Sequence, residues 1–139
     1  MKRTVGLDPG VHTGVATWTK ESGFVNVATM SHVEAVQYVS GLVLDGLVAQ
    51  VIFEDARRRT WFGGKGREAL QGAGSIKRDC AIWAEWCALW GVPYRSVSPQ
   101  SKGPKLSAEQ FKRLTGWEGR TSEHARDAAM LCWRGKAGA

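Results

Sequence analysis

The strongest constraint on the fold is the spacing of strand-like segments near the N-terminus. Residues 4–7, 14–19 and 24–30 are rich in β-branched and apolar side chains, and turn residues separate them at 9–10 (Pro-Gly) and 21–23 (Glu-Ser-Gly). Connections this short join antiparallel strands, because a parallel pair needs a crossover of about a dozen residues or more. The N-terminal third is therefore predicted to form an antiparallel meander of three strands.

Strand-like and helical patterns alternate after this meander. Ser31 and Glu34 have the spacing of a capping box, which predicts a helix from there to about Leu44. Further patterns predict strands at 50–54 and 92–97 and helices at 75–90 and 122–133. The expected order is βββαβαβα, without repeats or a long linker. We therefore expect one α/β domain covering residues 1–139.

The chain is basic and rich enough in apolar residues to fold. Lys and Arg total 19 against 13 for Asp and Glu, which gives a net charge of +6 over 139 residues. The hydrophobic share of 43% favours a packed core over disorder. A basic balance favours a polyanionic partner, most simply nucleic acid, although a solvated basic surface gives the same charge.

The sequence lacks the usual signals for a membrane or an oxidising compartment. No apolar stretch approaches the ~20 residues that span a bilayer, and the N-terminus has no signal-peptide core. We therefore expect a soluble cytoplasmic protein with no membrane contact. The three cysteines, Cys80, Cys87 and Cys132, form no Cys-x-x-Cys pair, so buried thiols are expected rather than zinc ligands or disulfides.

Acidic residues stand at the ends of predicted elements. Asp8 directly follows the first strand, and Glu54 ends the fourth. His124 and Asp127 are three residues apart on the last helix and share a face. If the first and fourth strands are parallel neighbours, Asp8 and Glu54 emerge at the same edge of the sheet. That edge is where active sites lie in open α/β sheets.

Such a cluster suits phosphodiester cleavage. Two metal ions about 4 Å apart stabilise the attacking and leaving oxygens and activate a water. Mg²⁺ and Mn²⁺ prefer carboxylate oxygens. Each acid taken singly also fits a turn, a solvated strand end or a helix surface. Their joint placement favours a metal site.

Four short motifs occur in order along the chain. Residues 6–10 are Gly-Leu-Asp-Pro-Gly, followed by Thr and Gly at 13–14, and residues 51–54 are Val-Ile-Phe-Glu. Gly-x-Gly stands at 72–74, and residues 122–129 are Ser-Glu-His-Ala-Arg-Asp-Ala-Ala. In this order they resemble the first, second and third motifs and the final helix of the RuvC-type Holliday-junction resolvases, in the ribonuclease H-like superfamily.

The resemblance implies a fold and an activity. The fold would be a mixed five-stranded sheet flanked by helices, with the first three strands antiparallel. Asp8, Glu54, His124 and Asp127 would be the catalytic metal ligands. They would hold two Mg²⁺ ions, with Mn²⁺ able to substitute. The protein would be a homodimeric crossover junction endodeoxyribonuclease that resolves four-way junctions by paired nicks. Its short chain is most similar to compact phage or prophage forms.

Two alternatives stay open within the predicted site. Asp55 directly follows Glu54 and is a further potential metal ligand. Glu123 and Asp127 are four residues apart, so Glu123 competes with His124 for the position beside Asp8. We expect His124 to bind the metal or to orient the water. Glu123 is expected not to bind the metal directly.

A basic segment with aromatic residues follows the fourth strand, where the family often has an aromatic wedge. It is predicted to bind phosphates and to stack one ring on an unpaired base, which stabilises binding by ~1–3 kcal/mol per base. By resemblance, a lysine after the fifth strand touches the scissile phosphate. The DNA-binding candidates are Arg57, Arg58, Arg59, Trp61, Phe62, Lys65, Arg67, Lys102 and Lys105.

The helix at 75–90 carries three tryptophans. Trp83 and Trp90 match the period of the core, whereas Trp86 falls outside it. We therefore expect Trp83 and Trp90 to be buried. Trp86 is expected to be exposed and to form part of a two-fold dimer contact.

Other functions compete with junction resolution. A ribonuclease H-like domain can bind branched DNA without cutting it, and a nuclease of this type can prefer flaps, forks or RNA–DNA hybrids. ATP-binding proteins of the actin and sugar-kinase class also carry Gly-x-Asp-x-Gly. They need two such domains, however, and 139 residues are too few.

Overall fold

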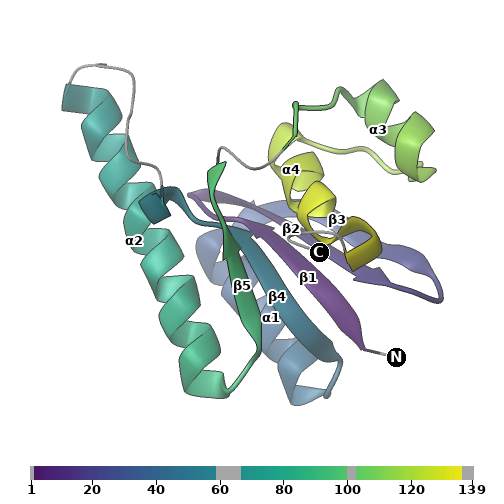
Figure 1. Cartoon of the computed structure of the whole chain (residues 1–139), viewed down its shortest axis with the longest axis horizontal. Helices are drawn as coiled ribbons and strands as arrows, with labels where there is room; N and C mark the ends of the chain where they lie inside the picture. Colours follow the sequence, from purple (N-terminus) through teal and green to yellow (C-terminus); the bar gives the residue numbers. More distant parts are fainter. Residues whose placement is uncertain (1, 59–66, 100–102, 136–139) are drawn as a thin grey trace.

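A mixed five-stranded sheet organises the protein (Figure 1). The computed structural model describes residues 2–58, 67–99 and 103–135. The strand order is β3-β2-β1-β4-β5, with β1–β2 and β2–β3 antiparallel and β1–β4 and β4–β5 parallel. The predicted sheet and its antiparallel meander are confirmed. The strands are β1 Arg3–Asp8, β2 His12–Thr19, β3 Gly23–Ser31, β4 Val48–Glu54 and β5 Tyr94–Val97.

Helices cover both faces of the sheet, and Figure 1 shows α4 and α1 on opposite sides. One core cluster joins α1 and α2 to the sheet, and the other joins α3 and α4 to it. The helices are α1 His32–Leu44, α2 Arg67–Trp90, α3 Ala108–Thr115 and α4 Glu123–Cys132, with short 3₁₀ turns η1 Ala56–Arg58 and η3 Trp133–Gly135.

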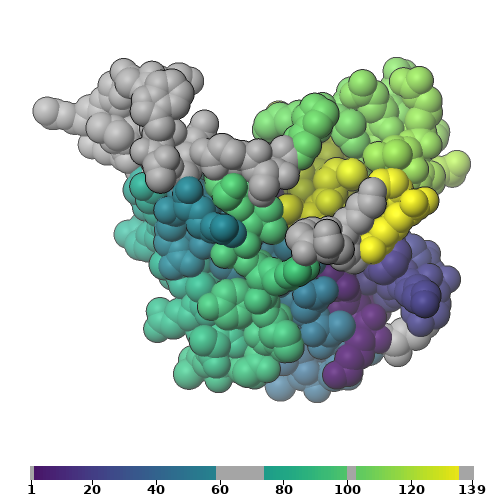
Figure 2. Space-filling view, viewed as in Figure 1, coloured from purple at the N-terminus to yellow at the C-terminus, as the bar shows by residue number. Residues whose placement is uncertain are grey.

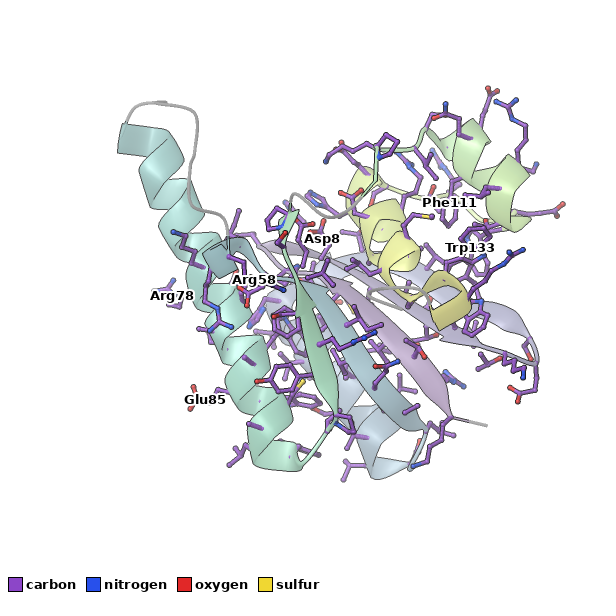
Figure 3. The ribbon with its side chains drawn as sticks, viewed as in Figure 1. Asp8, Arg58, Arg78, Glu85, Phe111 and Trp133 are labelled. Carbon is purple, nitrogen blue, oxygen red and sulfur yellow. The ribbon has the colours of Figure 1, made fainter. Side chains whose placement is uncertain are left out.

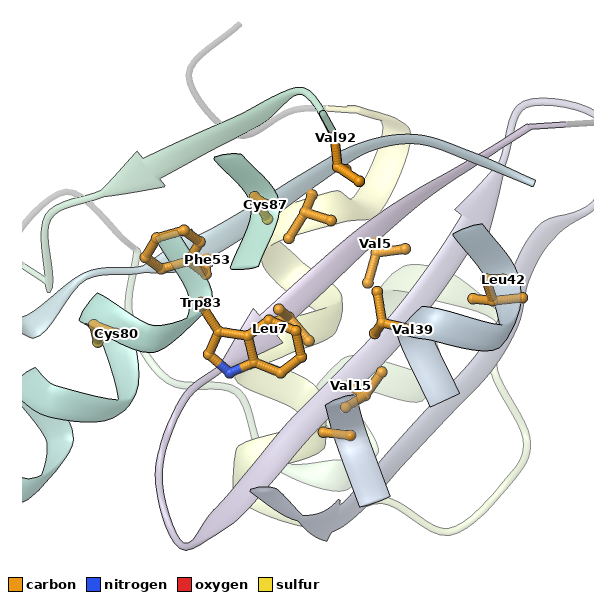
Figure 4. Close-up of a cluster of buried hydrophobic side chains, with 12 residues drawn as sticks. Val5, Leu7, Val15, Val39, Leu42, Phe53, Cys80, Trp83, Cys87 and Val92 are labelled. Atoms are coloured by element: carbon orange, nitrogen blue, oxygen red, sulfur yellow. The ribbon is translucent and has the colours of Figure 1, made fainter. Parts of the chain in front are cut away.

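The alternation of side chains along the strands separates the two faces. Leu7 and Phe53 lie in the core cluster under α1 and α2, with Trp83 packed against the sheet (Figure 4). Neighbouring strand residues point to the opposite face, because the side-chain period of a strand is two. Asp8 and Glu54 follow Leu7 and Phe53 directly and therefore face α4.

The local signals around the helices are only partly confirmed. The capping box of Ser31 and Glu34 is present at the start of α1. α2 begins at Arg67 rather than at residue 75, so Gly72 and Gly74 lie inside the helix and not before it. A helical glycine costs only about 1 kcal/mol relative to alanine, which a long packed helix tolerates.

The helix α3 was missed, and the expected element order is wrong by this one helix. Ser107 and Gln110 form a capping box, and Gly116 ends the helix in a left-handed conformation. These signals are visible in the sequence. The helix has only 8 residues and one buried side chain, Phe111, so it is too short to show a long apolar repeat, and helices without such a repeat are hard to predict from the sequence.

The three cysteines are free and buried, as predicted. Burial raises the pKa of Cys80 to about 11 and that of Cys87 to about 12, which keeps both thiols protonated and unreactive at neutral pH. No helix in the described ranges is both long and apolar enough to cross a bilayer.

Two glycines allow α4 to approach the sheet closely. A Cβ at Gly6 would overlap the carbonyl oxygen of Ala128, and one at Gly14 would overlap that of His124. Ala125, Ala128 and Ala129 give α4 a matching face of small side chains. The backbone of α4 therefore rests directly on β1 and β2.

Gly14→Ala should destabilise the fold by about 3 kcal/mol, because the added methyl group displaces backbone rather than a flexible side chain. Gly41→Ala is the matched control. Gly41 lies within α1 with nothing near its Cβ position, so this change should be neutral or stabilise by up to about 1 kcal/mol. Urea unfolding measures both. Equal stability of the two variants would contradict the close approach of α4.

Candidate active site

Asp8 and Glu54 end neighbouring strands at one edge of the sheet. β1 and β4 run parallel, and their register reaches Leu7 opposite Phe53. The next residue on each strand is an acid. The condition set by the sequence, that these strands be parallel neighbours, is therefore confirmed. Figure 3 shows Asp8 at the end of β1, beside α4.

The start of α4 brings His124 to Asp8. The side chain of Ser122 caps the helix by accepting a hydrogen bond from the Ala125 N–H at 3.1 Å. His124 Nδ1 then lies 3.0 Å from Asp8 Oδ2, although the two residues are 116 positions apart. Asp127 follows one turn later, with its side chain only 10% exposed. α4 thus places an imidazole and a nearly buried carboxylate at the edge formed by β1 and β4.

The turn after Asp8 is held by the threonine of the same motif. The hydroxyl of Thr13 donates to the carbonyl oxygen of Gly10 at 2.7 Å, in a buried position. This bond closes the connection between β1 and β2. The polar residues of the motif therefore shape the backbone that carries Asp8.

Glu123 forms an ion pair with Lys105. The Lys105 ammonium donates to a Glu123 oxygen and also lies 3.3 Å from Asp127 Oδ2. The hydrogen bond from Lys105 lowers the pKa of Glu123, and the bond to Glu123 raises the pKa of Lys105. Between the two alternatives left by the sequence, the geometry places His124 beside Asp8.

The donor groups suit a hard divalent cation. Within the described ranges, no three His, Cys, Asp or Glu side chains are grouped closely enough to hold a metal ion as they stand. The set nevertheless combines carboxylates with one imidazole, which are ligands that Mg²⁺ and Mn²⁺ accept. Asp127 already attracts the cationic group of Lys105. The residues therefore fit a metal by their chemistry.

Asp55 is buried and forms an ion pair with Arg57, whose side chain is 41% exposed. Arg57 donates from Nε to Asp55 Oδ1 at 2.9 Å and from Nη2 to Oδ2 at 2.7 Å, and its backbone N–H donates to Oδ1 at 3.0 Å. Burial raises the pKa of Asp55, but the bonds from Arg57 outweigh it, and the net pKa is lowered. Both oxygens of Asp55 accept hydrogen bonds from Arg57, which argues against metal binding by Asp55. Phosphate binding by Arg57 stays a prediction, because its side chain is 41% exposed.

The remaining DNA-binding candidates are only partly described. Arg58 is exposed and donates to the Ser96 carbonyl at 2.7 Å, which ties the end of β4 to β5. Arg67 is the first residue of α2. Arg59, Trp61, Phe62, Lys65 and Lys102 lie outside the described residues.

The tryptophans of α2 differ from expectation. Trp83 is buried as predicted, but Trp90 is 40% exposed, so its assignment to the core is wrong. Trp86, expected outside, packs against the core between the other two rings and stacks on Trp90 at a centroid distance of 5.4 Å. Trp86 and Trp90 are four residues apart, so their rings are neighbours on the surface of the helix. The spacing of core residues alone does not predict this stacking. The surface of α2 instead presents Ile82 and Leu89.

Arg126 was overlooked in the sequence, although it directly precedes Asp127. Its Nε donates to the Leu106 carbonyl at 2.9 Å, and its Nη1 donates to the Thr121 carbonyl at 2.8 Å. The signal available in the sequence was an arginine directly before a predicted metal ligand. Only the fold shows which carbonyl groups it meets.

Comparison with known proteins supports the assignment of the fold. No protein-family model matches the sequence, and a search of curated proteins finds no match. Among solved structures, the chain is similar to T. thermophilus RuvC in complex with a Holliday junction substrate. The TM-score is 0.57 at 17% sequence identity, over 94% of this chain and 90% of that chain. The protein has a ribonuclease H-like fold.

Arg57→Gln should destabilise the protein by about 2 kcal/mol at pH 7. This is less than the ~3–5 kcal/mol of a fully buried pair, because Arg57 is 41% exposed. The folded pKa of Asp55 is lowered, so its stabilisation is present above the unfolded pKa of ~3.9 and is lost as the pH falls through the folded value. Arg120→Gln removes an exposed cation that does not contact Asp55; it is the control and should show at most a small loss that does not depend on pH. Urea unfolding at pH 7 and pH 3 tests this, and an equal loss at both values for Arg57→Gln would contradict it.

Proposed function

We propose that the protein is a metal-dependent endonuclease that cleaves branched DNA, with the four-way Holliday junction as its substrate. The contact between His124 and Asp8 carries the proposal. It brings α4 and its Asp127 to the sheet edge where Glu54 also ends a strand. The fold is similar to a RuvC whose structure contains a Holliday junction, and the net charge of +6 suits a polyanion.

In this proposal the four residues Asp8, Glu54, His124 and Asp127 hold Mg²⁺ or Mn²⁺, two ions per site. The ions would supply positive charge at the attacking and leaving oxygens and a water activated for attack. Asp8 accepts a hydrogen bond from the His124 ring, or shares a proton with it, and so orients the imidazole. Lys105 lies at the rim of the site, where its ammonium can bind the scissile phosphate.

The basic groups around the site would bind the DNA backbone. Arg58 lies at the surface next to the end of β4. We retain phosphate binding for Arg59, Lys65, Arg67 and Lys102 and base stacking for Trp61 or Phe62 as proposals. Phosphate contacts of this kind make binding strongly dependent on salt.

A two-fold homodimer would supply the paired cuts that a four-way junction requires, because its axis coincides with that of the junction. Apolar side chains exposed on α2 support a dimer contact through this helix. Leu89 is 82% exposed, and Ile82 and Trp90 lie nearby on the same helix. Trp86 would not contact the partner directly; its ring stacks on that of Trp90 and so holds the Trp90 ring in place.

A branched-DNA binding module without catalysis is the second candidate. It is favoured by the position of Lys105, which already neutralises Glu123 and Asp127 without a metal. The two candidates differ in whether Mg²⁺ produces nicks. A panel of junction, flap, fork, duplex and RNA–DNA hybrid substrates separates them and ranks the substrates.

Asp8→Asn should lower junction cleavage by about 10³-fold and leave junction binding within about threefold, because one lost metal ligand removes several kcal/mol of charge stabilisation. Glu54→Gln and Asp127→Asn should behave alike. Asp45→Asn, at the far end of α1, is the matched control and should cut normally. Cleavage is measured with Mg²⁺ and binding by gel shift with Ca²⁺. Near-normal cutting by any of the three removes that residue from the catalytic set.

Leu89→Glu should shift the dimer toward monomer and uncouple the two nicks, because a charge would be buried in the apolar contact. Leu44→Glu introduces the same charge at a 75% exposed position on α1 and should leave the dimer intact. Sedimentation at cleavage-competent concentrations measures the dimer fraction. A Leu89→Glu protein that stays dimeric would exclude this face of α2 as the contact.

A further inference from the structure

The segment 103–121 lies beside α4 and carries both Lys105 and α3. Figure 2 shows its green atoms next to the yellow atoms of α4 at the molecular surface. The guanidinium of Arg126 holds both parts of the segment. It donates to the Leu106 carbonyl at 2.9 Å, to the Thr121 carbonyl at 2.8 Å and to the Thr121 hydroxyl at 3.0 Å. One side chain of α4 therefore fastens the segment near its beginning and at its end.

These bonds bear directly on Lys105, because Leu106 is the next residue. Arg126 is likewise the residue before Asp127. The same turn of α4 thus sets the position of Asp127 and of the backbone that carries Lys105. The ammonium of Lys105 reaches Asp127 Oδ2 at 3.3 Å.

The ion pairs of Lys105 cannot produce this placement alone. Its side chain is 58% exposed, and ion pairs of exposed side chains contribute little to stability. Ordering a long lysine side chain also costs conformational entropy, which offsets this gain. The bonds from Arg126 are charge-assisted and half-buried, so they are stronger. Phe111, buried against Phe24, anchors α3 further along the segment.

We propose that Arg126 is a positioning residue: by binding the carbonyl groups of Leu106 and Thr121, it holds the ammonium of Lys105 beside Asp127. The part of this inference that concerns cleavage rests on the proposed function, in which Lys105 binds the scissile phosphate. Arg126 does not touch the substrate and acts through Lys105. A guanidinium suits this role better than an ammonium, because its longer, rigid fork of N–H donors reaches both carbonyl groups in fixed directions, whereas a lysine ammonium is a compact group on a flexible chain.

The placement is tested first without DNA or metal. A carbodiimide joins an amine to a carboxylate only when the two are in direct contact, and peptide mass spectrometry locates the link. The unmodified protein should link Lys105 to Glu123 or Asp127. Arg126→Gln and Arg126→Lys should lower the yield at least about fivefold, the equivalent of about 1 kcal/mol. Arg120→Gln, a charge-matched change at an exposed position of the same segment, should not.

An undiminished link in both Arg126 variants would overturn the proposal. Thermal unfolding shows whether Arg126→Gln has lost its fold. If it has, the milder Arg126→Lys variant tests the proposal. If Arg126→Lys links as well as the unmodified protein, charge alone suffices and the positioning role is rejected. The crosslinking experiment does not require DNA cleavage, so its result is independent of whether the protein is a nuclease.

Kinetics then test whether Arg126 acts through Lys105. Arg126→Gln should lower kcat about 100-fold and change KM for the junction less than about threefold, as expected for a misplaced group. Lys105→Met should do the same. The double variant should be no slower than Lys105→Met alone, because two residues that act as one unit are not additive. Additive losses would overturn the proposal, whereas an unmodified protein that never cuts would refute the nuclease and not the positioning.

Discussion

The direct contact between the backbone of α4 and the sheet is the constraint on which the site depends. It exists because Gly6 and Gly14 have no side chain at the two points where α4 crosses β1 and β2. Gly14 lies opposite Asp8 in the β1–β2 register, and it touches the backbone of His124. The same glycine that admits the helix therefore brings His124 to Asp8. Any larger residue would separate the imidazole from the carboxylate.

The charges of the site explain why a cation is expected there. Acidic side chains gather at one edge of a protein whose net charge is +6. A DNA phosphate cannot approach such an edge unless positive charge stands between it and the carboxylates. Lys105 neutralises Glu123 and Asp127 at one side, and His124 borders Asp8 at the other. Divalent ions and the ammonium of a lysine are two ways to meet the same electrostatic requirement.

Local signals predicted most of the fold, while side-chain partners depended on tertiary contacts. The meander, the capping box of Ser31 and the acids at the strand ends are visible in short stretches of sequence. The partial burial of Trp86 and the exposure of Trp90 depend on which side chains of α2 meet the core, which is a tertiary contact. The contacts of Arg126 join positions up to 20 residues apart, and no local pattern encodes them. The parallel pairing of β1 and β4 had to be assumed before Asp8 and Glu54 could be placed together.

At the end of β4, two adjacent acids have different structural surroundings. Glu54 and Asp55 are consecutive, yet the alternation of the strand sends them to opposite faces. Glu54 faces α4 and the edge that Asp8 shares, whereas Asp55 is buried on the other side and bonded to Arg57. Arg57 fixes the backbone just after Glu54, and Arg58 fastens the same turn to β5 through Ser96. Two acids that look interchangeable in the sequence are therefore divided by the geometry. Glu54 ends the strand at the edge that Asp8 shares, and Asp55 stabilises that strand end through Arg57.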